Sequence, residues 1–294
     1  MTLRKVINET VYNLEDQVEC LQNNFPAWMV HPGFILKNNQ VVYRVEHIGD
    51  EEYSPKESFY FLHIPKTSGM SIKIPLLYAF NKQRMYSNFL QYINDEEMIK
   101  CDFISGHFGI YPIELFKKFN KKLITYTILR EPTERFLSNF LYKRDNPTLD
   151  DLDCFMHDPR QDNVQHKHLT CTLNIKDLTA HYNLLCENKI TYAEYQKRAL
   201  FYNDLVRVYD NIDDALENIN YIELVENQKD LSKLNTIISE KFGVTVPIQK
   251  PFENVGKNKD FINKIPKSMM NKIIENQNLD YELYEKVKMG YYKK

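Results

Sequence analysis

Apolar residues are spaced differently in the two parts of this chain, and the change comes near residue 59. Short apolar runs stand at residues 59–64, 103–104, 123–129 and 221–225. Between and after them, apolar residues recur at intervals of three and four, as in amphipathic helices. Short strands that alternate with such helices are typical of a parallel sheet covered by helices. We predict an α/β domain over residues 59–294, with helices from about residue 71 and at 112–119, 133–144, 149–156, 163–173, 192–200, 213–218, 231–242 and 267–289.

The first 58 residues follow another pattern. Residues 3–21 place seven apolar side chains three or four positions apart, which predicts a helix with one apolar face. Residues 34–37 and 41–45 are short apolar runs around Asn38, Asn39 and Gln40, which predicts a hairpin. We expect residues 1–58 to form an N-terminal helix and hairpin extension that shapes a binding site or mediates oligomerisation. The sequence leaves the oligomeric state open.

Overall charge and composition narrow the possible functions. With 38 Lys and Arg against 40 Asp and Glu, the net charge of −2 gives no general attraction to nucleic acid, so we expect no nucleic-acid partner and only local anion binding. The five cysteines lack a CxxC pair, which favours reduced thiols over a disulfide framework. The sequence shows no apolar secretion signal, and no stretch approaches the roughly 18 apolar residues of a membrane span. We expect a cytoplasmic protein.

The first chemical candidate is the segment between the predicted strand at 59–64 and the helix that follows it. A turn at such a place offers backbone N–H groups and the positive end of a helix dipole to a phosphate. Gly69 lets the backbone approach closely, and Lys66 adds a mobile positive charge. Because the lysine precedes the glycine, the loop is not the triphosphate loop GxxxxGK[ST]. We predict an anion-binding loop, with an ordinary strand-to-helix turn as the alternative; its residues are Pro65, Lys66, Thr67, Ser68, Gly69, Met70 and Ser71.

A second candidate begins where the predicted strand at 123–129 ends. Arg130 stands at this strand end and can bind a phosphate through two N–H groups at once. Ser138 lies two helical turns further on and can add its hydroxyl from the same side. The alternative is a helix surface on which Arg130 and Arg135 pair with Glu131 and Glu134.

Together, the two segments resemble a known pair of motifs. LHIPKTSGMS at residues 62–71 and LREPTERFLS at residues 129–138 are similar to the donor-binding motifs of sulfotransferases that use 3′-phosphoadenosine 5′-phosphosulfate (PAPS), in particular of glycan O-sulfotransferases and their bacterial relatives. The resemblance implies a P-loop-like parallel sheet flanked by helices, the sulfotransferase fold. It implies that the first motif binds the 5′-phosphosulfate of PAPS and the second binds the 3′-phosphate. The family's motifs more often carry Gly-Gly-Thr where this chain has Ser68, Gly69 and Met70, and aspartate where Glu131 stands.

Further positions extend the resemblance beyond the two motifs. Ser105-Gly106-His107 resembles the family's glycine-histidine step, which implies that His107 is the general base for the acceptor's proton. The helix that carries Asn163 and Gln165 resembles one with polar contacts near donor or acceptor, and helix capping is the alternative for both residues. Three later residues resemble a donor-contacting loop: Asn254, Gly256 and Lys257.

These residues lead to an expected reaction. We expect transfer of a sulfonyl group from PAPS, as co-substrate, to a hydroxyl of a glycan, lipid or small metabolite by in-line displacement, with Lys66 stabilising the leaving oxygen. The scheme needs no metal, and the spacing of His166, His168 and Cys171 does not put three ligands on one helical face. Two alternatives remain: a nucleotide-dependent phosphotransferase on a similar scaffold, and a non-catalytic PAPS-binding module.

Overall fold

The computed structural model describes most of the chain between residues 56 and 290. The described ranges are 56–69, 72–73, 76, 79–80, 85–87, 95–142, 144–174, 205–224, 232–243 and 259–290, with backbone strands at 5–12, 34–37 and 40–47 and single positions between 180 and 190. The predicted helix at 192–200 lies outside the described residues. So do five predicted site residues: Met70, Ser71, Asn254, Gly256 and Lys257.

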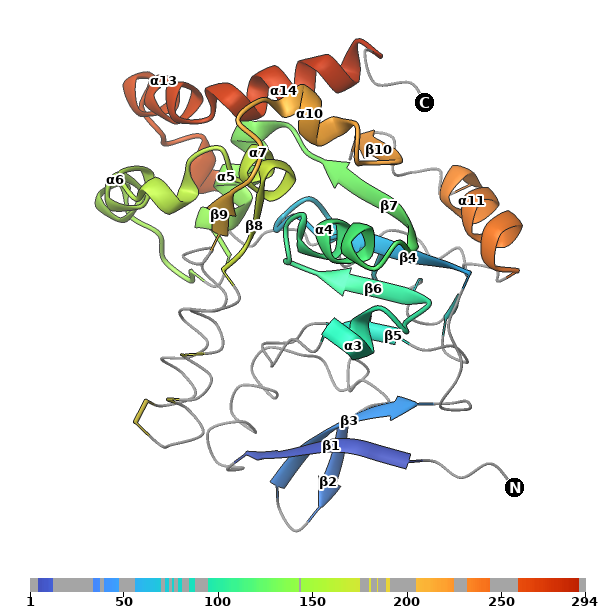
Figure 1. Cartoon of the computed structure of the whole chain (residues 1–294). Coiled ribbons are helices and arrows are strands. Elements are labelled where there is room, and N and C mark those ends of the chain that lie inside the picture. Colours follow the sequence, from blue (N-terminus) through green and yellow to red (C-terminus); the bar gives the residue numbers. More distant parts are fainter. Residues whose placement is uncertain are drawn as a thin grey trace.

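Five parallel strands form the central sheet (Figure 1). They are β4 (Glu57–Leu62), β5 (Met85–Ser87), β6 (Phe103–Gly106), β7 (Lys122–Leu129) and β10 (Tyr221–Leu224). Their order across the sheet is β10-β7-β4-β6-β5, and every neighbouring pair is parallel. In the central strand β4, residues 58–62 are all buried, as expected for a strand that is covered on both faces. The predicted α/β architecture with a parallel sheet is confirmed.

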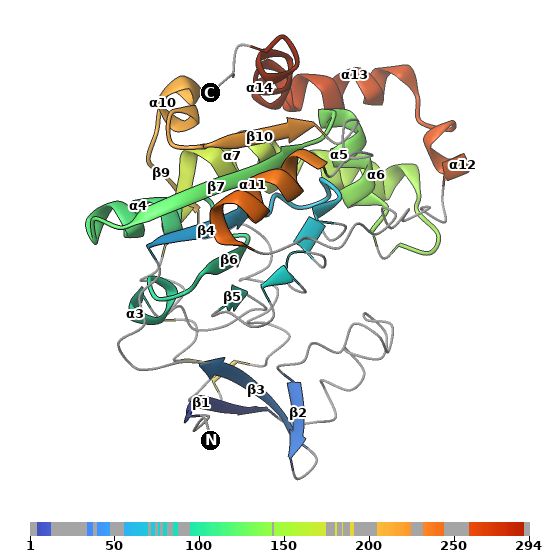
Figure 2. The same ribbon diagram turned by 90° about the vertical axis from the view of Figure 1, so that its right-hand side faces the viewer.

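Helices cover both faces of this sheet because successive side chains of each strand point to opposite sides. Tyr60 and Leu62 pack with α4 (Tyr111–Lys118), α10 (Ile212–Leu216) and α14 (Asn278–Lys288). Phe59 and Phe61 pack with α11 (Ser232–Phe242) and with the helical residues that follow the loop after β4, on the face turned to the viewer in Figure 2. The predicted strands and helices in these layers are therefore present, with ends that differ by a few residues.

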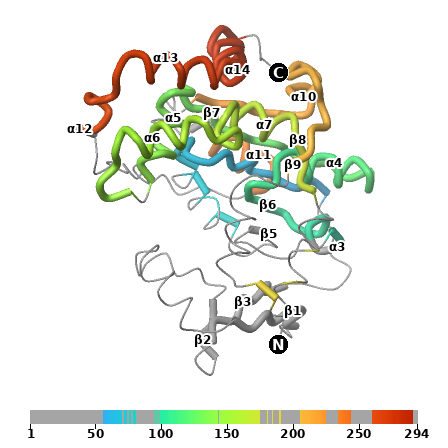
Figure 3. The backbone as a smooth tube through the Cα atoms, turned by 90° about the vertical axis from the view of Figure 1, so that its left-hand side faces the viewer, coloured from blue at the N-terminus to red at the C-terminus, as the bar shows by residue number. Residues whose placement is uncertain are grey.

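A third apolar cluster joins four helices next to the sheet (Figure 3). They are α5 (Pro132–Phe140), α6 (Leu149–Met156), α12 (Lys259–Ile262) and α13 (Lys267–Asn276). A short 3₁₀ turn, η2 (Pro159–Gln161), leads from α6 to α7 (Val164–Thr170). The chain also has a short helix that the sequence pattern did not predict, α3 (Asp95–Met98). In the described part of the chain, no helix is both long enough and apolar enough to cross a bilayer.

The predicted helix at 163–173 is too long. It ends at Thr170, and residues 171–173 form strand β8 (Cys171–Leu173), which pairs antiparallel with β9 (Leu205–Arg207). The pairing partner lies more than 30 residues away in sequence, so the local apolar spacing does not contain it. Tertiary pairing has here overridden a local helical pattern.

The N-terminal strands form a separate antiparallel sheet. Its order is β1 (Lys5–Tyr12), β3 (Gln40–His47), β2 (Phe34–Lys37), which confirms the predicted hairpin. The predicted helix at 3–21 is wrong for residues 5–12. Val6, Ile7, Thr10 and Val11 are β-branched, so they lose side-chain freedom in a helix and favour a strand.

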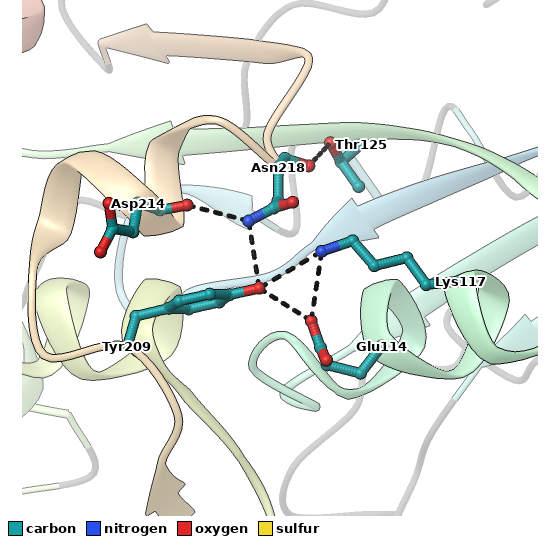
Figure 4. A network of polar contacts seen from close by, with 6 residues as sticks. All are labelled: Glu114, Lys117, Thr125, Tyr209, Asp214 and Asn218. Atoms are coloured by element: carbon teal, nitrogen blue, oxygen red, sulfur yellow. Dashed lines mark hydrogen bonds and ion pairs between the residues drawn. The ribbon is translucent and has the colours of Figure 1, made fainter.

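One end of the sheet is tied together by a polar network (Figure 4). The Tyr209 hydroxyl donates to Glu114 at 2.8 Å and accepts from Asn218 at 3.1 Å and from Lys117 at 3.3 Å. The Thr125 hydroxyl donates to the Asn218 carbonyl at 3.1 Å. These contacts hold α4, α10 and the first half of β7 together. The candidate site lies at the other end of β7.

The strand order reverses direction between β4 and β7. From β4 the chain passes to β5 and β6 on one side, and only afterwards to β7 and β10 on the other. The loops after β4 and β7 therefore leave in opposite directions, and open α/β sheets bind their ligands at such a switch point, beyond the carboxyl ends of the strands. Both predicted anion-binding segments begin there.

Candidate active site

The loop after β4 has a constrained backbone. Lys66 and Ser68 have positive φ angles of 68° and 59°, a left-handed conformation that is uncommon outside glycine. Between them, Thr67 is buried and its hydroxyl donates to the Ile64 carbonyl at 2.8 Å. Strained backbone of this kind clusters at ligand sites. In this structure the Thr67 hydroxyl therefore donates its hydrogen bond within the loop, to Ile64. The sequence had placed Thr67 among the residues that bind an anion.

Gly69, at the start of the helix after the loop, lies directly against the ring of His63. A Cβ at residue 69 would come within 2.0 Å of His63 Cδ2 and 2.1 Å of its Nε2. His63 is 8% exposed and stacks on Phe61 at 5.4 Å between ring centroids. The loop after β4 therefore rests on a buried imidazole, a contact that the sequence did not predict.

The two predicted anion-binding segments touch. Arg130 follows the end of β7, and its Nη1 donates to the Lys66 carbonyl at 3.4 Å, across 64 positions of sequence. Its Nε also donates to the Glu134 carboxylate at 3.2 Å, the helix-surface pair that was the alternative interpretation. Ser138 lies one turn beyond Glu134 on α5, so it is on the same side of this helix as the pair.

Glu131 caps α5 instead of pairing with an arginine. Its carboxylate accepts from the Glu134 backbone N–H at 2.6 Å, which satisfies one of the donors that a helix start leaves open. The other carboxylate oxygen accepts from the hydroxyl of Tyr281 on α14, and burial with the bond to Glu131 raises the pKa of Tyr281 to about 12. A glutamate at this position thus joins α5 to α14.

Gln165, on α7, holds the main chain of Arg130. The Arg130 N–H donates to Gln165 Oε1 at 2.8 Å, and Gln165 Nε2 donates to the Arg130 carbonyl at 2.8 Å. The side chain is fully buried. Gln165 therefore positions the second segment, and its predicted substrate contact stays a prediction.

Asn163 has a capping role. Its Oδ1 accepts from the backbone N–H groups of Leu279 and Asp280 at 2.8 and 3.1 Å, at the start of α14. Asp280 in return accepts from the N–H groups of Gln165 and His166 at 3.1 and 2.7 Å, at the start of α7. These contacts match the capping alternative for Asn163, and they lock the two helices behind the site.

His107 follows β6, on the other side of β4 from Arg130. Its Nδ1 lies 2.5 Å from the His63 carbonyl, which can only accept, so Nδ1 carries the proton and Nε2 is the basic nitrogen of the neutral ring. Burial lowers the pKa of His107 to about 4, while the bond to His63 raises it in part. His107 is therefore neutral near pH 7, the form that a general base requires.

Several basic groups lie close together beside the loop after β4. The His107 ring lies 4.6 Å from that of His63 and 6.3 Å from that of His168. Burial lowers the pKa of His63 well below its usual value, and the charges of His107, Lys73, His168 and Lys66 lower it further. Among the residues that the structure describes, each charge that shifts this pKa is basic, so the carboxyl end of β4 favours an anion.

The ammonium of Lys66 lies over an aromatic ring. Its Nζ is 3.8 Å from the ring centroid of Tyr142, which follows α5 and is half exposed. This contact places the Lys66 ammonium, which the sequence predicts to stabilise a leaving oxygen, on the side of the loop that faces α5. Tyr142 belongs to neither motif, and nothing in the sequence pattern marks it as a site residue.

Close approach of three imidazoles raises the question of a metal. Among the residues that the structure describes, no group of three or more His, Cys, Asp or Glu side chains is placed to hold a metal ion. The predicted spacing of His166, His168 and Cys171 assumes one helix, but Cys171 stands in strand β8 and not in α7, so that spacing does not apply to it.

Comparison with known proteins does not assign a family. No protein-family model matches this chain, and no curated protein is significantly similar to it. Function therefore has to be inferred from the residues and the geometry of the site.

Proposed function

We propose that this protein is a sulfotransferase that moves the sulfonyl group of PAPS to an acceptor hydroxyl. The observation that carries the proposal is the contact between Arg130 and the Lys66 carbonyl at the switch point of the sheet. It joins the two segments that resemble the family's donor motifs, and His107 lies on the neighbouring strand end. On this proposal the α/β domain is a P-loop-like sulfotransferase fold.

The loop after β4 would bind the 5′-phosphosulfate. Its backbone leads into a helix start, where N–H groups and the helix dipole favour an anion. Lys66 would move from Tyr142 to the oxygen that bridges sulfur and phosphorus, and would stabilise the charge that develops there. Leaving the ring costs only about 0.5–1 kcal/mol at an exposed site, so a bound phosphosulfate can attract this ammonium.

Arg130 would bind the 3′-phosphate at the other end of the donor. Its pair with Glu134 is an i, i+4 pair whose glutamate is largely exposed, and such pairs contribute about 0.3–0.5 kcal/mol. A phosphate can therefore displace the carboxylate and take the guanidinium in a bidentate contact. The buried amide of Gln165 fixes the backbone from which Arg130 projects.

His107 would remove the acceptor's proton. In the step, the S–O bond to the phosphate oxygen breaks, a new S–O bond to the acceptor oxygen forms, and the hydroxyl proton passes to Nε2 of His107. A pKa of about 4 makes His107 a weak base in the ligand-free protein. Negative charge of the bound donor would raise this pKa, so His107 would gain base strength only when donor is present.

Ligand binding separates this proposal from its alternatives. We expect adenosine 3′,5′-bisphosphate to raise the melting temperature and ATP with magnesium to have no effect; the reverse result would favour a phosphotransferase. Labelled PAPS should then transfer sulfate to a member of a panel of hydroxylated metabolites, lipids and oligosaccharides. Lys66→Ala should nearly abolish transfer and keep bisphosphate binding, and normal turnover in this variant would contradict the role of Lys66. Donor binding without any transfer would favour a non-catalytic module.

The cytoplasm remains our proposed location. Cys154 and Cys171 are free thiols in the described part of the chain, and a reducing compartment preserves free thiols. Secretion of the native protein into an oxidising compartment, seen by fractionation, would contradict this proposal.

A further inference from the structure

Lys73 is a lysine in the interior of the protein, next to the donor loop. Its side chain is 3% exposed, although lysine is almost never fully buried without a specific role or partner. Gly69 and Lys73 are both helical and four residues apart, so they lie on the same side of the helix. That side faces the His63 ring, which touches Gly69. Lys73 therefore belongs to the site, although it is in neither donor motif.

The direction of a helical side chain brings the Lys73 amine toward the loop. Side chains in a helix lean toward its N-terminus, and the N-terminus here is the donor loop. The electrostatic couplings agree, because the charge of Lys73 lowers the pKa of both His63 and His107. The buried amine of Lys73 is thus close enough to His63 and His107 to affect their protonation.

Among the described residues, the charge of Lys73 acts on two groups, His63 and His107, and other basic groups lie near these two. His63 follows β4, His107 follows β6, and Lys66 belongs to the loop; His168 on α7 lies behind His107 and is itself coupled to Arg135 on α5. Burial lowers the pKa of Lys73 to about 7. An anion that enters this cluster supplies the opposite charge, and opposite charge favours the protonated form of a buried amine.

We propose that Lys73 is a second lysine of the donor site, which takes up one proton from solvent when the donor's 5′-phosphate group binds and releases it when the nucleotide leaves. The inference rests on the proposed function for the identity of the anion. The step is a proton equilibrium only: the amine becomes an ammonium, and no other bond changes.

Proton uptake has a definite effect on affinity. Binding raises the pKa of Lys73 above its value of about 7 in the free protein. Affinity is then fully present below pH 7 and falls as pH rises through 7 toward the pKa of the complex. One linked proton limits the fall to about tenfold per pH unit. An arginine at this position would be charged throughout, so its affinity should stay level with pH.

Calorimetry with adenosine 3′,5′-bisphosphate tests the inference. Titrations at pH 8 in two buffers with different ionisation enthalpies give the number of protons taken up. We expect between half a proton and one proton for the wild-type protein and for Lys272→Met, an exposed control on α13. Lys73→Met should bind more weakly and take up no proton, and Lys73→Arg should bind without uptake. Methionine has a similar length and no charge, so it suits this buried position.

The possible results separate the inference from the proposed function. Bisphosphate binding without proton uptake, or with uptake that survives in Lys73→Met, overturns the role of Lys73 and leaves the sulfotransferase proposal standing. If the bisphosphate does not bind, the sulfotransferase proposal fails, and inorganic sulfate becomes the probe. Sulfate binding with uptake that depends on Lys73 would support Lys73 as an anion ligand of another activity. An absence of sulfate binding would overturn both.

Discussion

The ring of His63 occupies the space that a side chain at Gly69 would need. A Cβ on residue 69 would lie 2.0 Å from Cδ2 of this ring, far inside van der Waals contact. The ring cannot easily move aside, since Phe61 stacks on it at 5.4 Å and His107 lies at 4.6 Å. The loop after β4 and the ring of His107 therefore both lie against the same imidazole.

Gly69→Ala should displace His63 and disturb both sides of the site. We expect a loss of about 1–3 kcal/mol in the free energy of unfolding, the usual cost of overpacking a core, together with weaker bisphosphate binding. Removing the ring should relieve the clash, so the double variant Gly69→Ala with His63→Ala should be less destabilised than the two single effects added together. Urea unfolding of the four proteins measures this coupling. Additive effects would show that the loop does not rest on His63 in solution.

Tyr142→Ala should increase the affinity for the bisphosphate, because the Tyr142 ring holds the Lys66 ammonium. If the ring only holds Lys66 in the absence of donor, its loss frees the ammonium, and the contact energy of about 0.5–1 kcal/mol corresponds to a two- to fivefold tighter affinity for the bisphosphate. Tyr142→Phe keeps the aromatic face and should bind like the wild-type protein. Calorimetry measures both variants. Weaker binding in Tyr142→Ala would mean that the ring contacts the nucleotide itself.

Turnover should not decrease near pH 6.5, where an ordinary histidine becomes protonated. A general base is active when unprotonated, so activity is lost as pH falls through the pKa of His107, which burial lowers to about 4. We expect kcat/KM for PAPS, which reports the donor-free enzyme, to stay free of a His107-dependent decrease between pH 8 and pH 5. His107→Ala should lower kcat/KM by about 10²- to 10⁴-fold across this range. A decrease with a midpoint near 6.5 that disappears in His107→Ala would contradict the low pKa.

Much of the scaffold could be predicted because it depends on short-range patterns. The buried run in β7 and the arginine after it place Arg130 at a strand end, and the same logic places Lys66 after β4. Parallel pairing of these strands then brings the two segments together. Local spacing was misleading at residues 5–12, because the same apolar positions also suit a strand that pairs with β3.

The parts of the site that escaped prediction depend on contacts between distant residues. Nothing near Gly69 in the sequence shows that its neighbour in space is an imidazole, although Phe59, Phe61 and His63 alternate on one side of β4. Lys73 looks like an ordinary helical lysine until its burial is known. Gln165 was identified from a motif but given a substrate contact, since its partner, the backbone of Arg130, lies 35 residues away.

Gln165→Glu should test how far the site depends on that backbone pairing. The glutamate can still accept from the Arg130 N–H but cannot donate to the Arg130 carbonyl when ionised, so two oxygens face each other in a buried place. We expect about 1–3 kcal/mol less stability at pH 7.5 and weaker bisphosphate binding, because Arg130 loses its fixed backbone. Burial should raise the pKa of the new carboxyl group, and its protonated form can donate again. Urea unfolding at pH 7.5 and pH 5 should therefore show the gap to the wild-type protein narrowing as pH falls. A gap that stays constant or widens would mean that Gln165 is not held against Arg130.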